Sequence, residues 1–351
     1  MDQLEQVAQQ FRRFGEDECR HRSPLYHILS LTVADDPQLL APALHGRSGQ
    51  PLPNLMLAAV HQLLLEQNAD PVRAPHPLAQ FYGSCTQAAR DPAQAPPAFR
   101  DFVLQHVDAL RAVISRRLVQ TNEVRRSAYL FPALCFAASL FGERPLHLIE
   151  IGTSAGLNLL WDRYGYRAGA ELRYGDPQAP LVIDTEFRGA TPALLGLPPP
   201  RVAHRLGVDL NIIDVGQPSE VAWLHALIWP EHAQRRSMLD QALAIRAAHA
   251  LELIIGDGFA RGAELAAAVP AGALPCLYHT HVANQASKQT LAIFQNKLAD
   301  LGRHRDLVHV HNNIRPDLHL TAYRDGRELD LPLARVDGHG HWVEWLAPET
   351  R

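Results

Sequence analysis

The sequence has 351 residues and few of the features that mark several common protein classes. Its four cysteines are isolated and form no CxxC pair, so neither a disulfide framework nor a zinc knuckle is indicated. No apolar run approaches the roughly 20 residues that a membrane helix needs, and the N-terminus does not resemble a signal peptide. A net charge of −4 and the lack of a long basic run argue against nonspecific nucleic-acid binding. We therefore expect a cytoplasmic protein with no membrane or nucleic-acid partner; the oligomeric state is left open.

The composition, with 47% hydrophobic and 20% charged residues, is typical of a globular protein. The length exceeds that of most single domains, which predicts two domains or one domain with an appendage. Strand patterns are nearly absent from residues 1–118, so we predict an N-terminal helical cap domain there. Strands and helices alternate over residues 119–351, with a β-hairpin inserted near 167–200, which predicts a second, α/β domain.

One stretch organises this second domain. Residues 146–151 form an almost continuous apolar run, as in a parallel strand that is buried on both faces. Gly152 and Gly156 allow a tight turn, and the apolar residues that follow recur at helical spacing. A strand, a glycine loop and a helix in this order are typical of a Rossmann-like, doubly wound and mostly parallel sheet, where ligands bind at the carboxyl ends of the strands.

Two aspartates follow neighbouring strands of this predicted sheet. Asp209 ends the strand 202–208, where an acidic residue can accept both ribose hydroxyls of a nucleoside; alternatively it caps the next turn, and Asp214 is a rival for the same role. Asp257 follows the strand 251–255 and could meet an adenine amino group, although an aspartate between two glycines is also common in turns.

Further polar residues are candidates for the acceptor side of such a crevice. Asn122 and Glu123 precede an apolar helix over 129–140. Either they belong to its N-terminus, with Thr121 or Asn122 as the cap and Glu123 favoured by the helix dipole, or they face the ligand. His279 and Thr280 lie near the end of a fourth strand, where His279 or His281 could act as a general base; the alternative for His279 is a histidine of the core. The segments 318–323 and 341–346 are expected to close the sheet as an antiparallel pair.

Three pairs of histidines have the form H-x-H: His279/His281, His309/His311 and His339/His341. On a strand, such a pair projects from one face and can hold a metal, but only if two pairs converge. Histidines on strands are more often simply hydrogen-bonded, so we predict no metal site.

The glycine loop also satisfies the pattern G-x-S-x-G, in which Ser154 would be the nucleophile of a hydrolase. Asp257 and then His339 or His341 follow in the order that such a triad requires. The helical character of the preceding 145 residues and the absence of an HGGG-type segment disfavour this interpretation.

Several of these motifs together carry a resemblance. Glu150-Ile-Gly152-Thr-Ser-Ala-Gly156, Gly207-Val-Asp209-Leu and Gly256-Asp257 resemble, in order and spacing, three motifs of class I S-adenosylmethionine-dependent methyltransferases. More closely, the chain is similar over nearly its whole length to the bacterial family named domain of unknown function 2332. The motifs that carry this similarity are Thr121-Asn-Glu-Val, the glycine loop with Leu157-Asn-Leu, Trp161-Asp-Arg-Tyr, Gly207-Val-Asp-Leu, Trp229-Pro, His279-Thr and His339-Gly.

The methyltransferase resemblance implies S-adenosylmethionine as cofactor and a small-molecule acceptor. The implied cofactor-binding residues are Glu150, Gly152, Ser154, Gly156, Asn158, Asp209 and Asp257. His279 and Glu123 would be catalytic, with Asn122 and Thr280 binding the substrate. The sequence lacks Asp/Asn-Pro-Pro-Tyr after the fourth strand, which disfavours methylation of amino groups on bases or glutamine. The alternative is a protein of the same fold that binds a nucleoside-type ligand or a partner without turnover.

Overall fold

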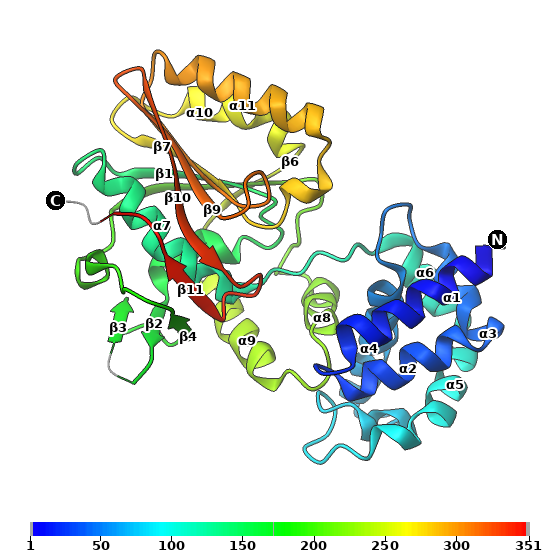
Figure 1. The fold of residues 1–351 in the computed structure, drawn as a ribbon. Helices are drawn as coiled ribbons and strands as arrows, with labels where there is room; N and C mark the ends of the chain where they lie inside the picture. The colour runs from blue at the N-terminus through cyan, green and yellow to red at the C-terminus, as the bar shows by residue number, and fades with distance from the viewer. Residues whose placement is uncertain (1–2, 171, 349–351) are drawn as a thin grey trace. The chain divides into compact units, whose positions relative to one another are not determined.

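The computed structural model describes residues 3–170 and 172–348, which form two compact units (Figure 1). The first unit combines Met1–Thr121 with Val215–Leu239, and the second combines Asn122–Asp214 with Asp240–Arg351. The segment Val215–Leu239 thus belongs to the helical unit, whereas the sequence analysis grouped it with the domain 119–351. Among the described residues, no helix has both the length and the apolar character needed to cross a membrane.

The first unit is helical. Its α-helices are α1 (Gln3–Arg13), α2 (Pro24–Ala34), α3 (Pro37–Leu40), α4 (Leu52–Ala69), α5 (Pro96–Gln105), α6 (Val107–Arg116), α8 (Pro218–Ala226) and the beginning of α9 (Ala233–Ala247). Short turns of other helix types connect them: η1 (Phe14–Cys19), η2 (Ala41–His45), η3 (Pro77–Phe81) and η4 (Pro92–Gln94).

Specific contacts tie the returning segment Val215–Leu239 into this unit. Trp223 of α8 is buried, and its indole donates a hydrogen bond to the carbonyl oxygen of Leu118 at 2.9 Å. The Glu231 carboxylate accepts from the Ser23 hydroxyl at 2.8 Å and from the Leu25 backbone N–H at 3.0 Å, at the start of α2. A carboxylate at a helix N-terminus satisfies free N–H groups and favours the helix dipole. The returning segment therefore completes the helical core.

The second unit contains one mixed sheet of eleven strands. The strands are β1 (Leu146–Ile151), β2 (Gly165–Ala168), β3 (Leu172–Gly175), β4 (Val182–Phe187), β5 (Val202–Asp209), β6 (Glu252–Ile255), β7 (Leu274–His279), β8 (Leu307–His311), β9 (Leu318–Arg324), β10 (Arg327–Val336) and β11 (Trp342–Trp345). The helical elements are η5 (Val124–Arg126), α7 (Ser127–Ser139), η6 (Leu157–Arg163), η7 (Ala193–Gly196), α10 (Gly258–Ala268), η8 (Ala283–Gln285), α11 (Lys288–Gly302) and the rest of α9.

The strand order is β3-β2-β4-β11-β10-β9-β8-β7-β1-β5-β6. The five strands from β8 to β6 are parallel to their neighbours. The strands β9, β10 and β11 continue the sheet in antiparallel pairs, and β4 then joins β11 in parallel. The α/β class is confirmed, but the sheet is wider and more mixed than a doubly wound parallel sheet. Helices α10 and α11 lie on one face and α7 on the other (Figure 1).

Two sequence predictions about this unit are wrong. The segments 318–323 and 341–346 do not pair with each other, because β10 lies between β9 and β11 and pairs with both. The segment after Gly156 forms the 3-10 helix η6 instead of an α-helix. The hydroxyl groups of Tyr164 and Tyr166 donate to the carbonyl oxygens of Leu157 and Trp161, at 2.6 and 2.5 Å, and so bind carbonyl groups that a longer helix would bond internally.

The inserted strands follow η6 directly. Strands β2 and β3 form an antiparallel hairpin, and β4 pairs with β2 in parallel. The connection from β1 to its neighbour β5 therefore consists of η6, three strands and η7, without an α-helix of its own.

Candidate functional site

The candidate site lies at the carboxyl edge of the parallel strands. Strand β1 is flanked by β5 on one side and β7 on the other, and the chain visits β5 and β6 before it crosses back to β7. The order of the strands thus reverses at β1. In open α/β sheets, this reversal leaves a crevice outside the carboxyl ends of the strands, where ligands bind.

The glycine loop follows β1 at this point. Gly152, Ser154 and Gly156 all have a positive φ, of 76°, 52° and 78°. A Cβ atom on Gly152 would collide with the Val282 side chain, which lies over the loop. Positive φ is unstrained only for glycine, so Ser154 holds a conformation that needs support from its surroundings.

Asp209 provides that support. Its Oδ2 accepts the backbone N–H of Ser154 at 2.8 Å, and its Oδ1 accepts the backbone N–H of Asn211 at 3.0 Å. The Asp209 side chain, at the end of β5, therefore stabilises the glycine loop that follows β1.

Glu150, the last residue but one of β1, is buried and accepts a hydrogen bond from the Thr153 hydroxyl at 2.6 Å. Burial raises the pKa of this carboxyl group to about 8, with a smaller lowering by the Thr153 hydrogen bond, a raising by Asp209 and a lowering by Arg126. Through its hydrogen bond with Thr153, Glu150 stabilises the glycine loop.

Asp257 begins α10. Its Oδ1 accepts the backbone N–H groups of Phe259 and Ala260, at 2.9 and 3.1 Å, so it is the N-cap of α10, a role that the sequence did not indicate for it. Two apolar side chains at this edge are each 74% exposed: that of Leu210, which follows β5, and that of Ile255, which ends β6. They give this end of the edge an apolar surface.

Asn122 and Asn158 join the segment before α7 to the loop. The side-chain oxygen of Asn122 accepts from the Leu157 N–H at 3.4 Å. Asn158 is buried, and its side-chain oxygen accepts from the Ser127 hydroxyl at 2.9 Å. The segment 122–127 thus contacts the residues that follow the glycine loop, while Asn158 lies in the interior.

Glu123 and His339 form a pair that joins two distant segments. Nδ1 of His339 lies 3.1 Å from Oε2 of Glu123. The Glu123 side chain is 3% exposed and that of His339 is 42% exposed. Glu123 also accepts the Arg125 N–H at 3.4 Å and so caps η5, which corrects the prediction that Thr121 or Asn122 caps the following helix. The buried Glu123 carboxylate therefore positions the solvent-accessible imidazole of His339.

Arg126 and His281 lie beside this pair. Nε of Arg126 donates to the carbonyl oxygen of Gly338 at 3.0 Å. His281 has a positive φ of 55°, and its backbone N–H donates to the Asn312 side chain at 2.7 Å. Burial is the main reason that the pKa of His281 is lowered to about 4; the Arg126 and His339 charges contribute to this lowering, and Asp337 opposes it. His281 is therefore neutral at physiological pH.

His279 lies deeper, on the face of the sheet covered by α10. It is fully buried, and its ring centroid is 5.2 Å from that of Phe259 and 5.2 Å from that of His309. Burial, with a contribution from His311, lowers its pKa well below 6.5. This environment favours the alternative of a core histidine over that of a general base. Thr280, the next residue, is also buried.

The H-x-H pairs have different environments. His309 and His311 share a face of β8, with ring centroids 4.5 Å apart, and together with His279 of β7 and His319 of β9 they form a row of imidazoles. His339 and His341 lie in a turn, 6.5 Å apart. Among residues 3–170 and 172–348, no group of three or more His, Cys, Asp or Glu side chains is arranged to hold a metal ion.

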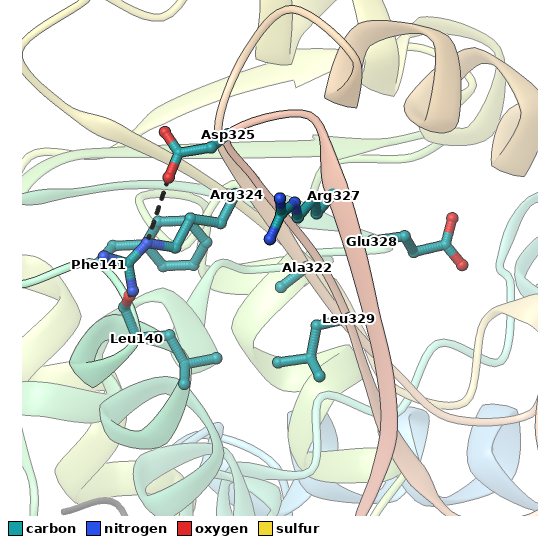
Figure 2. A pocket seen from close by; sticks show the side chains of 8 residues that line it. All are labelled: Leu140, Phe141, Ala322, Arg324, Asp325, Arg327, Glu328 and Leu329. Carbon is teal, nitrogen blue, oxygen red and sulfur yellow. Dashed lines mark hydrogen bonds and ion pairs between the residues drawn. The ribbon is translucent and has the colours of Figure 1, made fainter.

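A separate pocket lies at the far end of β9, on the edge opposite the glycine loop, because β9 runs antiparallel to β8 (Figure 2). Arg324 donates to the Leu140 carbonyl oxygen at 2.7 Å across it. Its lining residues are Leu140, Phe141, Ala322, Arg324, Asp325, Arg327, Glu328 and Leu329.

The fold and the site define an α/β protein with a glycine loop at the point where its parallel strands reverse order. The comparison with family models is specific: residues 8–345 match the model described as "Uncharacterized protein conserved in bacteria (DUF2332)". The chain belongs to this family. No curated protein and no solved structure matches the chain.

Sequence reasoning missed the pairing of Glu123 with His339 and the position of Arg126. Glu123 was a candidate, but His339 was considered only as a member of a hydrolase triad, of an H-x-H pair and of a family motif, and not as a partner of Glu123. The available signal was the Gly338-His339-Gly340 sequence, since two flanking glycines favour a tight turn that presents the side chain between them.

Proposed function

We propose that this protein binds S-adenosylmethionine at the carboxyl edge of its parallel strands and transfers the methyl group to a small-molecule acceptor. The observation that carries the proposal is the glycine loop at the strand-order reversal, held by Asp209 of the adjacent strand. The order β6-β5-β1-β7-β8 also suits a Rossmann-like arrangement of the parallel strands.

The chemistry of the edge fits such a ligand. The Asp209 carboxylate, at the end of β5, is an acceptor of the kind that ribose hydroxyls need, and the exposed Leu210 and Ile255 suit the flat face of a purine. The terminal nitrogens of Arg126 suit the carboxylate of the methionine part, because a guanidinium binds carboxylates through paired hydrogen bonds. Methyl transfer requires mainly the alignment of the acceptor with the methyl carbon and the sulfur, so positioning residues suffice for much of the catalysis.

The first test is binding. We expect micromolar affinity for S-adenosylmethionine or S-adenosylhomocysteine, about −8 kcal/mol, by titration calorimetry. Asp209→Ala should weaken binding by about tenfold or more, since a hydrogen bond to a charged group is worth roughly 1.5–3 kcal/mol. Asp214→Ala is the matched control and should bind like the wild type.

Absence of heat and of any thermal shift with either ligand at millimolar concentration would contradict the proposal. If Asp214→Ala weakened binding and Asp209→Ala did not, the ribose role would move to Asp214. Binding without turnover would leave the alternative of a nucleoside-binding protein on the same fold.

A serine hydrolase is the second candidate, favoured by the positive φ of Ser154 within G-x-S-x-G. Among the described residues, however, the Ser154 hydroxyl is buried and has no hydrogen-bond partner, so no histidine activates it. We expect no covalent labelling by a fluorophosphonate probe. Labelling of the wild type that is lost in Ser154→Ala, and retained in Ser127→Ala, would instead support acyl transfer.

A further inference from the structure

The pair Glu123–His339 has the arrangement of a positioned base. The buried carboxylate of Glu123 binds Nδ1 of His339, so the neutral imidazole carries its proton on Nδ1 and has its lone pair on Nε2. No described residue forms a hydrogen bond with Nε2, and the His339 side chain is 42% exposed. The lone pair is therefore accessible.

The turn that carries His339 is fixed on several sides. Oδ2 of Asp337 accepts the backbone N–H groups of His339 and His341, at 3.0 and 3.1 Å. The Thr185 hydroxyl donates to the Gly340 carbonyl oxygen at 3.0 Å. Gly340 has a φ of 78° and packs directly against the Arg125 carbonyl, where a Cβ atom would collide. The imidazole is thus held by a rigid turn rather than by a mobile loop.

The pair also adjoins the glycine loop. Glu123 follows Asn122, whose side chain accepts from Leu157 just after the loop. On the other side, Gly338 lies against the His281 ring, and Val282, the next residue after His281, covers Gly152. Four segments, 122–126, 152–157, 281–282 and 337–341, therefore meet at one place. This juxtaposition puts an accessible base beside the loop proposed to hold the cofactor.

We infer that His339 is the proton acceptor for the methylated substrate, that Glu123 is its positioning residue, and that the substrate is a nucleophile that carries its proton at neutral pH, an alcohol, a phenol or an N–H heterocycle. The inference rests on the proposed function. In the reaction, the acceptor oxygen or nitrogen forms a bond to the methyl carbon while the carbon–sulfur bond breaks and its electron pair goes to the sulfur. The proton of the acceptor passes to Nε2 of His339. A thiolate or carboxylate acceptor would need no such base.

The first experiment measures the free lone pair without any cofactor. Diethyl pyrocarbonate acylates unprotonated imidazole nitrogens, and peptide mass spectrometry follows the rate at each histidine. We expect rapid acylation of His339 and a severalfold lower rate in Glu123→Gln, because the glutamine amide can donate to Nδ1 and shift the ring proton to Nε2. Glu252→Gln is the matched control, since Glu252 binds His204, a histidine of similar exposure (41%), at 2.8 Å.

This result separates a positioning role from a merely structural one. If Glu123→Gln leaves the His339 rate unchanged in a folded protein, or if His339 is inert in the wild type, the inference is overturned. Glu252→Gln should alter the rate at His204 and leave that at His339 as in the wild type.

The second experiment identifies the acceptor class. The protein is incubated with [methyl-13C]S-adenosylmethionine and a bacterial small-molecule extract, and the 13C chemical shift of the transferred methyl group distinguishes O-, N- and S-methyl products. We expect an alkali-stable O- or N-methyl product, formed roughly 10²–10⁴-fold more slowly by His339→Gln with unchanged cofactor affinity. An S-methyl product or an alkali-labile ester overturns the inference. Failure to bind the cofactor, with Glu123-dependent reactivity of His339 intact, overturns the proposed function and leaves the positioned base.

Discussion

Glu150 is a carboxyl group that the fold keeps from water directly beneath the glycine loop. Burial is the main reason that its pKa rises from 4.5 to about 8, so near neutral pH the native state holds a proton that the unfolded chain has released. The sign follows from linkage: with more protons bound in the native state, stability is greatest below pH 4.5 and falls as the pH rises through about 8.

This sign gives a prediction for Glu150→Gln. Glutamine keeps an oxygen for the Thr153 hydroxyl but cannot ionise, so the variant should not lose stability between pH 6 and 9, whereas the wild type should lose up to about 1.4 kcal/mol per pH unit from this group. Thermal unfolding of both proteins across this range measures the difference. Parallel pH curves for the two proteins would mean that Glu150 is ionised in the native state.

Residue roles at the site could be predicted from the sequence only in part. The position of Asp209 at the carboxyl edge of the sheet could be predicted, because this residue follows an apolar run that forms a strand. The partner of its carboxylate, the Ser154 amide, does not follow, because it depends on the backbone of the neighbouring strand's loop. Glu123 and His339 are 216 residues apart, so no local pattern indicates their contact.

At the scale of elements, the histidine row across β7, β8 and β9 provides a second pH dependence of opposite sign. Burial lowers the pKa of His279 and His309 well below 6.5 and that of His311 to about 3, with the neighbouring imidazoles contributing. Below pH 6.5 these histidines become protonated in the unfolded chain but stay neutral in the native state. Stability from these groups is therefore complete above pH 6.5 and is lost as the pH falls.

We expect the three histidines together to reduce the free energy of unfolding by roughly 4 kcal/mol per pH unit below pH 6, at about 1.4 kcal/mol each. His309→Leu should reduce this slope by about one third, even if the substitution changes stability at pH 7. Denaturant titrations at pH 5, 6 and 7 test it. An exposed histidine, His304, supplies the control: His304→Leu should leave the slope unchanged. A wild-type slope no steeper than that of His309→Leu would show that the row takes up protons in the native state.

The elements themselves were largely predictable where periodicity is strong and local. Residues 146–151 form β1, as their almost continuous apolar run indicated. The prediction of an α-helix after Gly156 was wrong because helical spacing of apolar residues also suits a 3-10 turn whose carbonyl groups are bound by Tyr164, just after the turn, and by Tyr166 of β2. Spacing records which side chains are buried, not which backbone hydrogen bonds form.

At the scale of the whole molecule, the division into units is the feature that sequence order conceals. The chain leaves the sheet after β5, adds α8 to the helical core of the first unit, and returns through α9 to form β6. Two hydrogen bonds hold this returning segment in the first unit: Trp223 donates to the Leu118 carbonyl oxygen, and Glu231 accepts from the Ser23 hydroxyl. The boundary is defined by such tertiary contacts between segments far apart in the sequence.

The pairing of β4 with β11 has a consequence for the order in which the chain can fold during synthesis. Thr185, in β4, contacts the backbone of His341, which is made 156 residues later. At a translation rate of about 5–20 residues per second, the hairpin β2–β3 and strand β4 must wait roughly 10–30 s with one edge of β4 unpaired. The nascent chain therefore carries an open strand edge beside the ribosome while 156 of its 351 residues are made, and the last strand of the described residues to emerge is the one that closes it.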